Sequence, residues 1–210
     1  IKQDITNILF HINHITVPEV MRVLVQSSDC KIDAFLGPSH VSVISGSKIY
    51  EEFPRDYNKP VVVSGFEPVD VMQSLYMIVK QFVEKRSDLE IEYKRLVSYE
   101  GNIKAQELIN KYFKKVPFKF RGIGEVEDSG YELKEQYDKY NSKIAYKDIL
   151  PSTEVKDNKA CRCPDILKGV AKPHDCKIFG TLCTPTNPIG SCMVSSEGAC
   201  SAYYKYGNLL

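Results

Sequence analysis

The stretch VVVSGFEPVDVMQSLYMIVKQFV, residues 61–83, decides the fold. It opens with three consecutive valines, a β-branched run that predicts a short strand ending at Ser64-Gly65. Pro68 then begins a helical pattern, because proline suits the first turn of a helix. Apolar residues recur along this helix at three- and four-residue spacing: Val69, Met72, Leu75, Tyr76, Val79, Phe82 and Val83. A strand followed directly by a helix predicts one repeat of a parallel α/β sheet.

The same alternation continues on both sides of this stretch. Residues 5–12 form an apolar run of strand length, and Pro18 begins another helical pattern. Residues 32–36 predict a second short strand. Further helices are expected at residues 104–113 and 131–140. Strands that alternate with helices favour a parallel sheet with right-handed crossovers.

Composition is that of an ordinary globular protein, with 43% hydrophobic and 26% charged residues among 210. The net charge of +1 gives no electrostatic reason to expect nucleic acid or an anionic membrane as a partner. The longest apolar stretch is too polar to span a bilayer. Residues 148–158 combine proline with mixed charge and look like a linker. We therefore predict an α/β fold, with a parallel-sheet domain and flanking helices at residues 1–148 and a small cysteine-rich module at residues 149–210.

Two loops are expected at the carboxyl ends of predicted strands, where ligands bind in open α/β sheets. The first, Gly37-Pro38-Ser39-His40, offers an imidazole, and the second, Gly65-Phe66-Glu67-Pro68, offers a carboxylate. A structural interpretation is equally open: the glycines supply turns, and Glu67 favours the positive end of a helix dipole. His40 and Glu67 are candidate site residues.

Cysteine is concentrated in one segment. Six of the seven cysteines fall within forty residues: Cys161, Cys163, Cys176, Cys183, Cys192 and Cys200. A metal, an iron–sulfur cluster or a set of disulfides would each explain this concentration. The odd total disfavours a fully paired disulfide framework. The N-terminus shows no basic region followed by an apolar run, so we expect a reducing cytoplasm, where structural disulfides are rare.

Spacing orders the remaining alternatives. Zinc sites usually use pairs of knuckles with two to four residues between the cysteines, and Cys161-Arg162-Cys163 is too tight for one. Iron–sulfur clusters take four thiolates with more variable spacing, and loops rich in glycine and proline suit their size. Four ligands would leave two cysteines, which could act as a redox dithiol beside the cluster. The residues alone favour iron–sulfur over zinc, and zinc over disulfides.

Several long motifs resemble one known family. The segment 161–204 and the motif SCMVSSEGACSAYYKY, residues 191–206, resemble the C-terminal module of the HypD family of [NiFe]-hydrogenase maturation proteins. FLGPSHVSVISG (residues 35–46) and VVVSGFEPVDVMQ (residues 61–73) resemble that family's second α/β domain. RGIGEVEDSGYEL (residues 121–133) is similar to a further family segment. The resemblance covers essentially the whole chain.

The resemblance implies a division of labour among the cysteines. The family carries a [4Fe–4S] cluster on a C-x14-C-x6-C-x16-C pattern, which is met here by Cys161, Cys176, Cys183 and Cys200. Cys163 and Cys192 then match the family's redox-active pair, an arrangement that resembles ferredoxin:thioredoxin reductase. Cys30 stays outside the pattern and is expected to be a small packed residue.

The function implied is an assembly scaffold more than a turnover enzyme. Together with a small HypC-type chaperone, the family holds an iron ion while the Fe(CN)2CO unit is built in the full-length complex. Cyanide comes from HypE–HypF proteins, and the hydrogenase large subunit is served indirectly. Electrons would pass from the cluster through the dithiol. Glu197 matches an acidic residue on which the family relies, and the motif residues His40 and Glu67 would line the interdomain cleft.

An alternative function is an iron–sulfur-dependent disulfide reductase that resembles ferredoxin:thioredoxin reductase. One departure from the family pattern bears on both functions. The motifs C-G-T-H-E, G-P-G-C-P-V-C and G-F-E-T-T of the family's N-terminal domain do not occur in this sequence. The chain is therefore expected to correspond to the C-terminal part of a HypD protein, without the cysteine that binds the iron.

Overall fold

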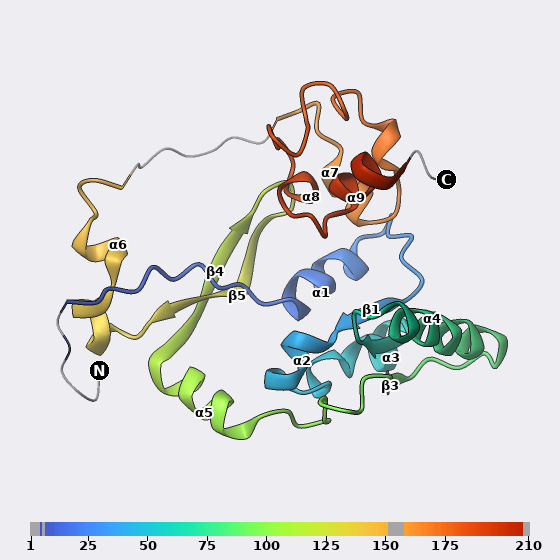
Figure 1. Cartoon of the computed structure of the whole chain (residues 1–210), viewed down its shortest axis with the longest axis horizontal. Helices are drawn as coiled ribbons and strands as arrows, with labels where there is room; N and C mark the ends of the chain where they lie inside the picture. Colours follow the sequence, from blue (N-terminus) through green and yellow to red (C-terminus); the bar gives the residue numbers. More distant parts are fainter. Residues whose placement is uncertain (1–4, 6, 151–157, 208–210) are drawn as a thin grey trace. The chain divides into compact units, whose positions relative to one another are not determined.

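The computed structural model describes residue 5, residues 7–150 and residues 158–207. Within these residues it is a mixed α/β structure with a parallel sheet and flanking helices, which confirms the predicted fold class (Figure 1). The chain divides into two compact units.

One unit, Ile32–Tyr112, is called the sheet unit here. The other, called the cysteine unit, combines the residues up to Lys31 with those from Phe113 onward. The predicted boundary between residues 148 and 149 falls inside the cysteine unit and stays a prediction. The iron–sulfur character of the cysteine-rich module also stays a prediction.

Three parallel strands form the centre of the sheet unit: β1 (Phe35–Pro38), β2 (Val61–Ser64) and β3 (Leu89–Ile91), in the order β1-β2-β3. Phe35 is paired with Val61, and Val61 with Leu89. The three valines of β2 are fully buried, as expected for a central strand covered on both faces. The predicted strand at residues 61–63 is confirmed, and the one at residues 32–36 is displaced to begin at Phe35.

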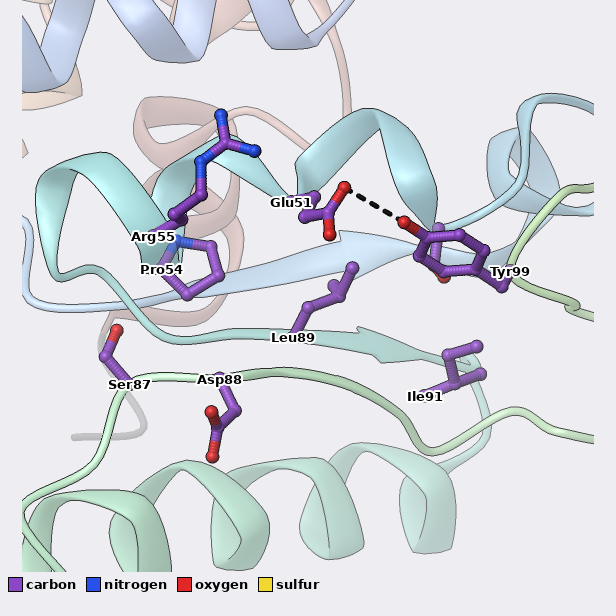
Figure 2. A pocket seen from close by; sticks show the side chains of 9 residues that line it. Glu51, Pro54, Arg55, Ser87, Asp88, Leu89, Ile91 and Tyr99 are labelled. Carbon is purple, nitrogen blue, oxygen red and sulfur yellow. Dashed lines mark hydrogen bonds between the residues drawn. The ribbon is translucent and has the colours of Figure 1, made fainter.

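The helices of the sheet unit are α2 (Ser39–Ser45), η1 (Lys48–Tyr50), α3 (Glu52–Tyr57), α4 (Pro68–Val83) and α5 (Ile103–Tyr112). In Figure 2 the strands lie between α3, which carries Arg55, and a helix on the other side of the sheet. The helices predicted to begin at Pro68 and to cover residues 104–113 are both confirmed, because their patterns were long and well delimited.

The orientation of α4 differs from what its apolar pattern suggests. Its buried residues are Asp70, Ser74, Ile78 and Gln81, whereas the apolar face is exposed; Val69 is 77% and Met72 67% exposed. Asp70 and Gln81, two of these buried polar side chains, have specific partners. Gln81 Nε2 donates to Glu90 Oε1 at 2.9 Å, and Gln81 Oε1 accepts from the backbone N–H of Asp88 at 2.7 Å. Hydrogen bonding therefore fixes the face that α4 presents to the sheet.

An antiparallel hairpin of β4 (Phe113–Phe120) and β5 (Gly124–Leu133) runs through the cysteine unit and packs against α1 (Pro18–Gln26) (Figure 1). Its register shifts between Val116 and Phe118. Pro117 lies at that shift, because proline has no N–H to give to a ladder. The helix predicted to begin at Pro18 is confirmed.

Two sequence expectations in the cysteine unit are wrong. Residues 131–140 are not one helix: the first three end β5, and a 3-10 helix, η2, follows at Glu135–Tyr140. Strand pairing overrode the helical pattern there. The apolar run at residues 5–12 forms no strand among its described residues, in which Phe10 makes a single bridge to Asn141. Asn141 caps α6 (Ser142–Ala145) with its side chain.

Short elements carry the cysteine-rich segment: α7 (Cys163–Leu167), η3 (Pro173–Asp175), α8 (Ser191–Val194) and α9 (Ala199–Tyr206). Proline lies in the first turn of α7 and of η3, and glycine precedes α8 and α9. Helices this short bury little apolar surface by themselves. The segment is therefore held together by its core, which consists largely of cysteine side chains.

Candidate functional site

The six clustered cysteines meet in one buried core. Cys163, Cys176, Cys183, Cys192 and Cys200 are each at most 7% exposed, and Cys161 is half-buried against them. Met193, Ile166 and Ile178 complete the core. Cys30 is half-buried elsewhere in the unit. The structure thus brings together all four predicted cluster ligands and both members of the predicted redox pair.

Each thiol reaches this core from a different local setting. Cys163 begins α7, Cys192 lies in α8, and Cys200 lies in α9. Cys176 follows η3, and its Sγ donates to the carbonyl oxygen of Ala160 at 3.6 Å. Cys183 Sγ accepts from the backbone N–H of Ile189 at 3.4 Å. The short helices and turns therefore aim side chains from 40 residues of sequence into one volume.

Cys192 lies between two other sulfurs. Its Sγ is 3.0 Å from that of Cys200, and its backbone N–H donates to Cys163 Sγ at 3.4 Å. Cys163 Sγ is also 3.1 Å from Ser191 Oγ. Cys192 thus contacts a predicted cluster ligand through its sulfur and its predicted redox partner through its backbone N–H.

These contacts shift the pKa values of Cys163 and Cys192 in opposite directions. The Cys192 side chain is the main cause that lowers the pKa of the Cys163 thiol; burial opposes it, and hydrogen bonds from Ser191 and from the Cys192 backbone N–H lower it further. The Cys163 side chain, together with burial and the contact with Cys200, raises the pKa of the Cys192 thiol. Burial also raises the pKa of Cys161 and of Cys200. Of these two thiols, Cys163 therefore has the lower pKa.

Four thiols of this core are the ligands that the sequence predicts for a [4Fe–4S] cluster. Among the described residues, no three His, Cys, Asp or Glu side chains are grouped closely enough to hold a single metal ion. A [4Fe–4S] cluster occupies more space than one ion and takes four thiolates. The predicted ligands supply four thiols in one apolar core, and those of Cys161 and Cys200 each interact electrostatically with those of Cys176 and Cys183. These residues fit such a cluster in number and chemistry.

Glycine is required where the backbone passes the sulfurs. A Cβ on Gly190 would lie 2.6 Å from Cys161 Sγ and 3.1 Å from Cys163 Cβ. A Cβ on Gly198 would meet the backbone of Cys192. Real Cβ contacts are longer than these, so the two glycines allow the chain to approach the thiols closely.

The tip of the β4–β5 hairpin contacts the same core. Arg121 Nη1 donates to the carbonyl oxygen of Ile189 at 2.9 Å, and Ser191 Oγ donates to the carbonyl oxygen of Arg121 at 3.3 Å. The site thus includes Arg121 and Ser191, which the sequence reasoning did not single out. Arg121 opens the motif RGIGEVEDSGYEL, whose resemblance to the family was the available signal. Nothing in the local sequence pointed to Ser191.

A pocket of about 220 Å³ opens between the hairpin tip and the cysteine core. Its lining includes Arg121, Lys159, Cys161, Cys163 and Gly190. Two cationic side chains therefore lie beside a predicted cluster ligand and a member of the predicted redox pair.

The two predicted loops lie side by side at the carboxyl end of the sheet, because β1 and β2 are adjacent and parallel. The ring of His40 packs on that of Phe66, with centroids 5.1 Å apart. Glu67 is exposed and lies 3.6 Å from Arg95 Nη2. Sequence analysis missed the strongest contact here, between Arg95 Nη2 and the buried carboxylate of Asp70 at 2.8 Å. Asp70 was hidden in a pattern of apolar residues.

A larger open pocket, about 560 Å³, lies on the α3 face of the sheet unit (Figure 2). Leu89 and Ile91 point into it from β3, and Tyr99 donates a 2.9 Å hydrogen bond to Glu51 at its side. No predicted site residue lines this pocket.

Glu197 lies in the turn between α8 and α9, and its side chain is exposed. Its backbone N–H donates to Ser195 Oγ at 3.2 Å. His40 and Glu67 belong to the sheet unit, and Glu197 to the cysteine unit. The predicted interdomain cleft therefore stays a prediction. None of the helices in the described part of the chain has the length and apolar character needed to cross a membrane.

Taken together, the fold and the site define a mixed α/β protein whose cysteine-rich segment gathers six cysteines, five of them buried, in one core. Comparison with known proteins identifies the family of this protein. The chain matches the HypD family, described as the hydrogenase formation hypA family, over residues 1–207. It belongs to that family.

Curated relatives agree with this assignment. Hydrogenase maturation factor HypD2 of Bradyrhizobium diazoefficiens is 45% identical over 213 residues, which cover 98% of this chain and 56% of the relative. Hydrogenase maturation factor HypD of Cupriavidus necator is 45% identical, over 92% of this chain and 52% of the relative. The Escherichia coli factor of the same name is 38% identical, over 97% of this chain and 54% of the relative. The chain spans about half the length of these relatives.

Proposed function

We propose that this chain supplies the cysteine-rich and α/β portion of a hydrogenase maturation scaffold. The names of its relatives support this role, which concerns a protein about twice as long as the chain. The observation that carries the proposal is the single buried core in which six cysteines meet. Four thiols in the family's ligand spacing, with two more in contact with them, suit an electron relay.

In this proposal Cys161, Cys176, Cys183 and Cys200 hold a [4Fe–4S] cluster, which supplies electrons when it is bound. The apolar neighbours Met193 and Ile178 limit the access of water to these thiols. Cys163 and Cys192 form the redox pair, which stores two electrons as a dithiol and releases them on forming a disulfide. The 3.0 Å contact between Cys192 and Cys200 supports a direct path between the pair and a cluster ligand.

The cargo of the full-length complex would be the Fe(CN)2CO precursor iron, held jointly with a HypC-type chaperone. HypE–HypF proteins would donate the cyanide, and the hydrogenase large subunit would receive the product. His40, Glu67 and Glu197 are exposed polar side chains that could serve iron or partner binding. The protein would work as a redox-active scaffold more than as a turnover enzyme, in the cytoplasm.

Iron analysis of cysteine variants tests the proposal. Anaerobically purified protein should contain about four irons per chain, with matching sulfide. Cys176→Ala should lose the iron, whereas Cys163→Ala and the control Cys30→Ala should retain it. Equal loss from Cys163→Ala and Cys176→Ala would contradict the division into ligands and redox pair. Zinc without sulfide would contradict the cluster itself.

A partner assay tests the scaffold role. When the chain is coexpressed with a small HypC-type protein, the two should copurify. The alternative function, a disulfide reductase resembling ferredoxin:thioredoxin reductase, is favoured by the pocket beside Cys163. Catalysed reduction of a disulfide on another protein, without binding of the HypC-type partner, would support that alternative.

A further inference from the structure

The pocket at the tip of the β4–β5 hairpin lies next to one member of the proposed redox pair. Cys163 is among its lining residues, and Cys192 is not. Cys192 instead has its sulfur 3.0 Å from that of Cys200, on the side of the proposed cluster. Of the two, only Cys163 lines the pocket, where it lies beside the proposed ligand Cys161, whereas Cys192 contacts the proposed ligand Cys200.

The pocket also has a definite charge. Arg121 and Lys159 contribute two cations, and none of its nine lining residues among those described carries a carboxylate. Arg162, which is close in sequence, is not part of the lining, and its Nε donates to Asp165 at 3.0 Å. A partner that enters this pocket would meet positive charge near the sulfur.

Size restricts what can enter. The pocket holds about 220 Å³, and Cys163 is only 1% exposed. Gly190 lies directly against Cys161 and Cys163 and has no side chain, so this wall of the pocket cannot be widened by moving a side chain away. A slender aliphatic chain fits such a space better than an aromatic one.

From these three observations we propose that the pocket is a docking site for a slender disulfide with carboxylates near its sulfur atoms. Cys163 is the attacking thiol and Cys192 the resolving thiol. Arg121 and Lys159 select the anionic partner. This inference rests on the proposed redox pairing of Cys163 and Cys192, and adds to it the order of the two thiols and the class of substrate.

The reaction balances without a further reagent. Cys163 loses its proton to solvent, and its sulfur attacks one sulfur of the external disulfide. A Cys163–substrate disulfide forms, the external S–S bond breaks, and the first thiolate leaves. Cys192 then loses its proton and attacks Cys163 Sγ, which releases the second thiolate and leaves a Cys163–Cys192 disulfide. The dithiol loses two electrons, and the external disulfide gains two.

Two probes of similar length separate charge from reactivity. Dithiodiglycolate carries two carboxylates, and bis(2-hydroxyethyl) disulfide is neutral. The reduced, iron-loaded protein should react faster with the dianion. Arg121→Gln and Lys159→Gln should each slow the dianion about three- to tenfold at low salt and leave the neutral probe nearly unchanged. Arg121→Lys should recover most of the loss, and the control Lys177→Gln should change neither rate.

Trapping identifies the attacking thiol. Cys192→Ser should accumulate one mercaptoacetate adduct, which peptide mass spectrometry places on Cys163. Cys163→Ser should form no comparable adduct on Cys192. A Cys192 adduct formed equally fast, or equal slowing of both probes in Arg121→Gln, would overturn the proposal. Iron content distinguishes the two levels: if iron is retained without preference for the dianion, only the pocket proposal fails, whereas iron loss in Cys163→Ser counts against the proposed function.

Discussion

Replacing Gly190 with alanine tests whether the sulfur of Cys161 has to keep its present position. The backbone of Gly190 has φ −93° and ψ 153°, which alanine adopts without strain. Its new Cβ would lie 2.6 Å from Cys161 Sγ and 3.1 Å from Cys163 Cβ. Optimal contacts between such atoms are about 3.5–4.0 Å. The Cys161 sulfur would therefore have to retreat by about 1 Å.

The cost depends on whether that sulfur is bound. Overpacking in a core usually costs about 1–3 kcal/mol. In protein without iron, Cys161 can rotate about its Cα–Cβ bond, so we expect the low end, about 1 kcal/mol, in the free energy of unfolding. A Cys161 that ligates a cluster has no such freedom. The main effect of Gly190→Ala should therefore be loss of iron.

Two measurements separate these effects: iron and sulfide per chain after anaerobic purification, and urea unfolding of the iron-free protein. Gly180→Ala is the matched control. Gly180 has φ +73°, and a Cβ added there would have no atom within 4 Å, so alanine should cost about 1–2 kcal/mol through the left-handed backbone and leave the iron in place. If Gly190→Ala kept its full iron content, Cys161 could not be a ligand in this arrangement.

Two further predictions concern stability. Burial raises the pKa of Glu19, whereas the 2.6 Å hydrogen bond from Lys115 lowers it, and the net result is a pKa below the ordinary value of 4.5. Lys115→Gln should therefore cost about 1–2 kcal/mol of unfolding free energy above pH 5, and this difference should shrink in acid as Glu19 protonates. Equal losses at pH 3 and pH 7 in urea unfolding would contradict this. Met193 is 1% exposed in the cysteine core and Met72 67% exposed on α4. Met193→Ala should cost about 2–5 kcal/mol and Met72→Ala less than about 0.5 kcal/mol in thermal unfolding, and similar losses from both would show that the burial of Met193 is wrong.

Much of the sheet unit could be predicted from the local sequence pattern. Three adjacent valines predict a strand that is covered on both faces, and Pro68 marks the start of a helix. β2 and α4 were therefore predictable. The parallel order then placed the loops of His40 and Glu67 side by side. The face that α4 buries was not predictable, because the hydrogen bonds of Asp70 and Gln81 reach residues elsewhere in the sequence.

Failures in the cysteine unit have a related cause. Residues 131–140 read as a helix, but the first three pair with β4, and pairing across a hairpin depends on a strand outside the local window. Similarly, Arg121 and Ser191 are 70 residues apart and meet only because the hairpin tip reaches the cysteine core.

The sequence by itself determined the chemistry of this protein: which residues carry thiols, how they are spaced, and which family they resemble. Only the tertiary structure decided which of those thiols lie together. It gathered six sulfurs into one core and placed Cys192 against Cys200 and Cys163 beside a cationic pocket. Spacing along a chain limits which side chains can meet, whereas packing of the short helices against the hairpin tip selects the contacts that form.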